Sequence, residues 1–69
     1  MLLRISEYGF IETKEIVSIV LDGGNEENTF FYWEFVLTGD NCLISDNFST
    51  REEANDWIDT ILTRIKKGE

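Results

Sequence analysis

The most apolar stretch of the chain spans residues 29–37, Thr-Phe-Phe-Tyr-Trp-Glu-Phe-Val-Leu, in which only Thr29 and Glu34 are polar. Aromatic and β-branched residues favour a pleated, half-buried strand. Because successive side chains of a strand point to opposite faces, Phe31, Trp33, Phe35 and Leu37 share one face. We predict that this face belongs to the core and that the rest of the chain is arranged to cover it.

Two segments before this strand also have the pattern of strands. Residues 2–5 form a short first strand, followed by a turn or bulge at residues 7–9 and a further extended stretch at residues 10–11. Residues 16–21, Ile-Val-Ser-Ile-Val-Leu, are nearly all apolar and β-branched. This strand is therefore either covered on both faces, or exposes one face that meets another subunit.

Turn-forming residues separate the strands. Residues 22–28, Asp-Gly-Gly-Asn-Glu-Glu-Asn, predict a longer hairpin loop, because glycine permits positive φ and Asn and Asp tolerate tight turns. Residues 38–41 predict a second turn, and residues 42–45 the last strand. Since all the connections are short, the strands are expected to form an antiparallel meander.

The C-terminal segment carries the signals of a helix. Thr50 is a suitable N-cap and Glu53 completes a capping box, while Ser49 with Glu52 offers the same pattern one residue earlier. Gly68 provides a stop. Apolar residues recur at helical spacing and form one stripe: Ala54, Trp57, Ile58, Ile61, Leu62 and Ile65. We predict that this stripe packs on the aromatic strand. The fold class is then α+β, a single domain over residues 1–69, with an antiparallel β-meander of about four strands packed against one C-terminal helix.

Three segments carry a resemblance to other proteins. They are Glu15-Ile-Val-Ser-Ile19, Trp33-x-Phe-Val-Leu-x-Gly39 and Phe48-Ser-Thr-x-Glu-Glu-Ala54-x-x-Trp57-Ile58. With these segments the chain resembles small uncharacterised bacterial and phage proteins over most of its length. The resemblance implies a β-meander followed by a C-terminal helix, and it carries over no catalytic residue.

Length and cysteine content indicate the oligomeric state and the cellular compartment to expect. A chain of 69 residues buries only about 60% of the surface of its unfolded state, so a homodimer would cover apolar surface that the monomer exposes. A single cysteine excludes an internal disulfide and favours the cytoplasm. The N-terminal residues do not form a secretory signal, and the apolar runs fall far short of the ~20 residues that span a bilayer. We therefore expect a cytoplasmic protein with no membrane contact.

Charge indicates what kind of partner is favoured. Fourteen acidic and six basic residues give a net charge of −8, and no lysine or arginine occurs from Glu15 to Thr50. Such a surface repels nucleic acid and anionic lipid, so direct nucleic-acid binding is not expected. A partner is expected to be a protein, neutral or basic. The alternative is that the charge serves only solubility.

The residue inventory leaves little room for catalysis. The absence of histidine removes the commonest general base and metal ligand, together with every Ser-His or Cys-His pair. Cys42 lies in an apolar strand and is expected to be a small buried core residue. The loop at residues 22–28 has neither the spacing of an EF-hand nor that of a phosphate-binding loop. We predict no catalytic residue, no cofactor, no metal site and no enzymatic activity.

The candidate interaction surface lies on the side of the aromatic strand opposite the core. There the meander either curls enough to bury the aromatic side chains, or exposes them as a patch for dimerisation or partner binding. Together with the acidic residues of the preceding loop, the predicted surface comprises Phe30, Tyr32, Glu34, Asp22, Glu26 and Glu27.

Two functions follow as hypotheses. The first is a small acidic, non-enzymatic protein–protein interaction module that self-associates. The second is an acidic mimic of DNA, or an anti-defence inhibitor of a nucleic-acid-binding protein. It is motivated by the span without lysine or arginine, and it requires carboxylates arrayed along one face.

Overall fold

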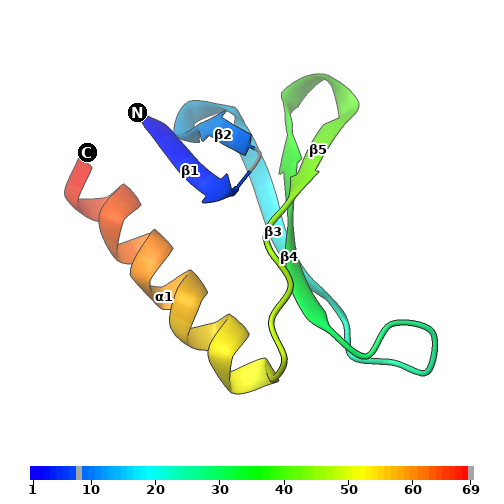
Figure 1. Cartoon of the computed structure of the whole chain (residues 1–69). Coiled ribbons are helices and arrows are strands. Elements are labelled where there is room, and N and C mark those ends of the chain that lie inside the picture. The colour runs from blue at the N-terminus through cyan, green and yellow to red at the C-terminus, as the bar shows by residue number, and fades with distance from the viewer. Residues whose placement is uncertain (8, 69) are drawn as a thin grey trace.

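The computed structural model of the protein describes residues 1–7 and 9–68 and has an α+β architecture. Within these residues, five antiparallel strands form two small sheets and are followed by one helix (Figure 1). The first sheet is a hairpin, and the second has three strands in the order β3-β4-β5. In chain order the elements are β1 (Leu2–Ser6), β2 (Gly9–Glu12), the 3₁₀ turn η1 (Thr13–Glu15), β3 (Ile16–Gly23), β4 (Phe31–Leu37), the 3₁₀ turn η2 (Thr38–Asp40), β5 (Asn41–Ile44) and α1 (Arg51–Gly68).

The predicted fold class is confirmed, although the strands of the described chain number five and form two sheets rather than one. Residues 10–11 do not extend β1 but return beside it, with Leu3 opposite Ile11 and Arg4 opposite Phe10. The predicted turn at residues 7–9 includes Tyr8, which lies outside the described residues. Because side chains alternate along each strand, Leu3, Ile5 and Ile11 lie on one face of the hairpin and are all buried.

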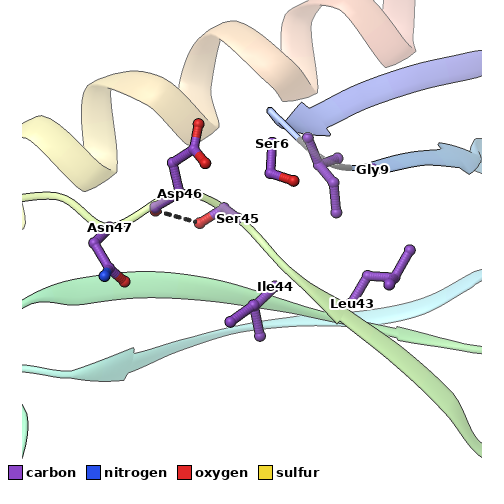
Figure 2. A pocket seen from close by; sticks show the side chains of 8 residues that line it. Ser6, Gly9, Leu43, Ile44, Ser45, Asp46 and Asn47 are labelled. Carbon is purple, nitrogen blue, oxygen red and sulfur yellow. Dashed lines mark hydrogen bonds between the residues drawn. The ribbon is translucent and has the colours of Figure 1, made fainter.

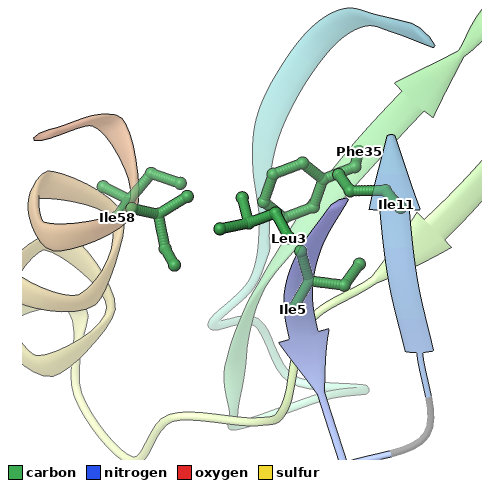
Figure 3. Packing of buried hydrophobic residues seen from close by; sticks show 6 residues of the cluster. Leu3, Ile5, Ile11, Phe35 and Ile58 are labelled. Atoms are coloured by element: carbon green, nitrogen blue, oxygen red, sulfur yellow. The ribbon is translucent and has the colours of Figure 1, made fainter. Parts of the chain in front are cut away.

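The core lies between the hairpin, β4 and the helix. Its buried members are Leu3 and Ile5 of β1, Ile11 of β2, Phe35 of β4, and Ile58 and Ile61 of α1 (Figure 3). The hairpin lies between the C-terminal half of α1 and the three-stranded sheet (Figure 1). The aromatic strand therefore shares its cover between the helix and the hairpin, whereas the sequence pattern predicts the helix alone.

Two aromatic contacts join the helix to the sheet. The indole Nε1 of Trp33 donates a hydrogen bond of 2.8 Å to the backbone oxygen of Ala54. The rings of Phe35 and Trp57 meet edge to face, with 6.1 Å between centroids and 86° between planes. The prediction that the helical stripe packs on the aromatic strand is confirmed. It is wrong for Leu62, which is largely exposed because it lies at the margin of the stripe.

The start of α1 has the N-cap predicted at Thr50. The backbone N–H of Glu53 donates to Oγ1 of Thr50 at 3.1 Å, which satisfies one of the amides that a first helical turn leaves unpaired. Acidic residues occupy the first turn and basic residues the last, an order that suits the helix dipole. In the part of the chain that the structure describes, no helix has both the length and the apolar character needed to cross a membrane.

Phe31 differs from the other residues predicted for the core face. It is only half-buried and lies outside the core cluster. Its ring packs instead over Gly24, where φ is +69° and an added Cβ would lie 2.3 Å from Cε1 of Phe31. The guanidinium of Arg51 lies 5.7 Å from the centre of the same ring. Phe31 thus contacts both the loop after β3 and the first residue of α1.

Candidate interaction surface

The three-stranded sheet has one face turned away from the helix, and we call it the outer face. The strand register defines it: Val20 of β3 lies opposite Glu34, which lies opposite Ile44 of β5. Side chains on this face come from all three strands: Ser18, Val20, Asp22, Tyr32, Glu34, Val36, Cys42 and Ile44. No element of residues 1–7 and 9–68 covers it, and those of its residues that belong to β3 and β5 are all exposed.

Apolar side chains surround a carboxylate at the centre of the outer face. Val20 is 48% exposed and Ile44 is 51% exposed, large values for β-branched residues inside strands. Glu34, between them on the central strand, is half-buried. Within the described ranges no lysine or arginine forms an ion pair with it. A partner that covers this face would bury apolar area, and it would need a cation or hydrogen-bond donor for Glu34.

At one end of the outer face, a tyrosine and a carboxylate form a hydrogen-bonded pair. The hydroxyl of Tyr32 donates to Oδ2 of Asp22 at 3.2 Å. Partial desolvation of the ring raises the pKa of Tyr32, and the hydrogen bond to Asp22 and the negative charges of Asp22 and Glu34 raise it further. The second oxygen of Asp22 accepts a 2.7 Å hydrogen bond from the amide of Gly23. The phenol is thereby held as a neutral donor beside two carboxylates.

The remaining predicted surface residues lie in the loop beyond the sheet. Asn25 organises this loop, since its Oδ1 accepts from the amides of Glu27 at 3.0 Å and Asn28 at 2.8 Å. Glu26 and Glu27 are exposed there, and Phe30, just before β4, is 48% exposed. The structure therefore brings together Asp22, Tyr32 and Glu34 of the predicted surface, and places Glu26, Glu27 and Phe30 in the neighbouring loop.

The prediction for Cys42 is wrong, because this residue is exposed rather than part of the core. Its register opposite Val36 turns its side chain to the outer face, which the described chain leaves open. The apolar residues of the outer face were not predicted as a surface. Alternation along β3 and β5 carries the signal, but it shows which residues share a face and not which face is covered.

A cavity of about 360 Å³ adjoins β5 on its free side (Figure 2). It separates the strand from the N-terminal hairpin, and its lining residues are Ile5, Ser6, Gly9, Leu43, Ile44, Ser45, Asp46 and Asn47. A neighbouring pocket of about 300 Å³ is lined in part by Arg4, Arg64, Trp57 and Asp46. Among the described residues, no group of three or more acidic or cysteine side chains is placed to hold a metal ion.

No family model, curated protein or solved structure matches the chain. The resemblance to small bacterial and phage proteins therefore extends to the architecture, strands followed by a C-terminal helix, and identifies no family.

Proposed function

We propose that the chain is a small acidic protein-binding module without enzymatic activity, and that the outer face of the three-stranded sheet is its main contact surface. One observation carries the proposal. Val20, Val36 and Ile44 form an apolar surface on regular secondary structure, and no described element covers it. Exposed apolar patches with polar surroundings are typical of sites where another protein binds.

The charges around this patch favour a basic partner. Glu34 lies at its centre and Asp22 at its end, and strands β3 to β5 contain no lysine or arginine. A partner with a lysine or arginine over Glu34 would supply the missing counter-charge and would be attracted by the net charge of −8. This is the partner chemistry expected from the sequence, and the proposal adds that such a partner binds the outer face.

Self-association belongs to the same proposal, but the outer face supports only a weak form of it. Three strands about 4.8 Å apart and about seven residues of 3.3 Å long give a face of roughly 300 Å². Stacking two such faces would bury roughly 600 Å² in total, about half of what stable complexes bury. It would also bring Glu34 of one copy towards Glu34 of the other. Dimers are therefore expected only at high protein concentration.

The distribution of acids favours a protein-binding module over a DNA mimic. Among the acids of the span without lysine or arginine, Asp22 and Glu34 lie on the outer face. Glu26 and Glu27 lie in the loop beyond the sheet, and Glu15 lies in η1 before β3. Phosphate mimicry calls for carboxylates in rows along one surface. The mimic stays a prediction without a structural observation in its favour.

A binding selection tests the proposed surface. The protein is immobilised and panned against a display library of folded miniproteins, and selected binders are titrated against three variants. Val20→Lys should weaken binding at least tenfold, because it places a long charged side chain in the apolar patch. Leu2→Lys is the matched control, since Leu2 is exposed on the hairpin, away from the outer face, and its replacement should change nothing.

Glu34→Gln separates the two kinds of partner. It should weaken the binding of basic miniproteins, and it should strengthen self-association measured by sedimentation equilibrium, because the like charge is removed. Binders that tolerate both Val20→Lys and Glu34→Gln would refute the assignment of the outer face.

A further inference from the structure

The free edge of β5 offers unpaired backbone groups. The amide of Ser45 donates to the carbonyl of Trp33 at 2.9 Å, so the hydrogen bonds between β4 and β5 fall at this pair and at every second pair along the strands. Leu43 and Asn41 therefore turn their backbone groups to β4. Cys42 and Ile44 turn theirs to the open side, where the described chain places no strand. Such an edge is a template for a further strand.

The cavity beside β5 lies where the side chain of an added strand would enter. Leu43 of β5 and Gly9 of the hairpin lie on opposite sides of it (Figure 2), and Ile5 also lines it. Opposite residues of an antiparallel pair share a face, so the residue opposite Leu43 would point to the core side of the sheet and into this cavity. Leu43 is 40% exposed, and an apolar side chain there would cover it.

Charges at the ends of β5 decide what can pair with it. Asp40 and Asp46 each lie three residues from Leu43, one before the strand and one after it. In the antiparallel register that pairs Cys42 of one copy with Ile44 of the other, so that the outward backbone groups of both edges meet, Asp40 of each copy would come near Asp46 of the other. Like charges directly opposite each other are destabilising, so a second copy is disfavoured and basic residues at the same positions are favoured.

We propose that β5 binds an extended segment of another protein by strand addition, and that this segment has an apolar centre with a lysine or arginine at each end. The segment would pair with the backbone of Cys42 and Ile44, fill the cavity with its central side chain, and place its basic ends at Asp40 and Asp46. Arg4 and Arg64 line the pocket on the far side of Asp46, and in the described chain neither forms an ion pair with it. The inference rests on the proposed function in requiring a protein partner, but it concerns a different surface from the outer face.

Amide hydrogen exchange followed by NMR tests strand addition directly. The probe is the heptapeptide Lys-Thr-Val-Ile-Val-Thr-Lys, titrated into the full chain. At saturation the amides of Cys42 and Ile44 should exchange at least tenfold more slowly, whereas the amide of Leu43, already bonded to β4, should not change. The peptide Glu-Thr-Val-Ile-Val-Thr-Glu is the control for charge and should bind at least tenfold more weakly.

Two variants separate backbone pairing from charge. Cys42→Pro removes one edge donor and should weaken peptide binding about tenfold, while Cys42→Ala keeps the donor and should bind like the parent. The backbone of Asn41, at φ −93° and ψ 150°, suits a residue before proline. If Cys42→Pro does not fold, the double variant Asp40→Asn/Asp46→Asn tests the charge contacts instead. It should bind the lysine peptide and the glutamate peptide with equal affinity.

The outcomes against the proposal are distinct. Equal binding of the two peptides to the parent protein overturns the charge assignment. If the amides of Cys42 and Ile44 exchange more slowly as the protein concentration rises without peptide, a second copy of the chain occupies the edge of β5. If Val20→Lys no longer bound the heptapeptide, the peptide's binding site would be the outer face rather than the edge of β5. Val20 lies two strands away from the free edge of β5, so the two surfaces are tested separately. Miniprotein binding at the outer face can fail while heptapeptide binding at β5 persists, and heptapeptide binding can fail while miniprotein binding persists.

Discussion

Replacing Phe35 by leucine tests the packing on which every surface described above depends. Phe35 is fully buried and meets Trp57 edge to face. A substitution of similar size costs up to about 1.5 kcal/mol, and the lost aromatic pair about 0.5–1.5 kcal/mol, so we expect about 2 kcal/mol in total. The entropy of unfolding for 69 residues is about 145 cal/mol/K, so the melting temperature should fall by about 14 °C. The domain should still fold, since chains of this length have roughly 3–10 kcal/mol of stability.

Urea denaturation followed by tryptophan fluorescence measures this loss, because Trp57 touches the substituted side chain. The midpoint should move while the slope of the transition stays the same, since the surface exposed on unfolding hardly changes. Phe10→Leu is the matched control: Phe10 is 61% exposed, beside Arg4, and its replacement should cost less than about 1 kcal/mol. Equal losses for the two variants would refute the placement of Phe35 at the centre of the core.

Three further outcomes are expected. Thr50→Ala removes the N-cap of α1 and should cost about 1 kcal/mol by urea denaturation; no change would mean that the cap is redundant. Gly24→Ala should cost about 2 kcal/mol, because φ is positive there and the methyl group meets the ring of Phe31, whereas Gly9→Ala, with 3.6 Å to the nearest atom, should be tolerated. The raised pKa of Tyr32 contributes stability that is present below about pH 10 and is lost as the pH rises through the raised value, so Tyr32→Phe should flatten this part of the pH–stability profile; an unchanged profile would contradict the contact with Asp22.

Local patterns predicted the elements that carry strong signals of their own. Thr50 and Glu53 predicted the start of the helix, because capping depends on residues only three positions apart. The period of two along β4 predicted which of its side chains turn to the core, and Trp33, Phe35 and Leu37 do so, whereas Phe31 on the same face stays outside the core cluster. These predictions needed no knowledge of how distant segments meet.

The arrangement of the hairpin could not be predicted in the same way. Leu3, Ile5 and Ile11 show the alternation of strands, but nothing local indicates that their face enters the core beside the helix. The same limit applies to Cys42: an apolar neighbourhood in sequence suggested burial, and the register with Val36 turned the side chain outward. Of the candidate surface, Asp22 and Tyr32 were predicted separately, and only the pairing of β3 with β4 shows that they are hydrogen-bonded.

The hairpin's place between helix and sheet has a consequence for how the domain folds. Leu3 and Ile5 meet Ile58 and Ile61, so the two ends of the sequence complete the same core. Contacts between such distant residues form late, because a long loop must close before they give any gain. The central three strands can pair early, but the chain becomes resistant to proteolysis only when both ends have docked. Trimming either end should therefore unfold the whole domain rather than shorten it.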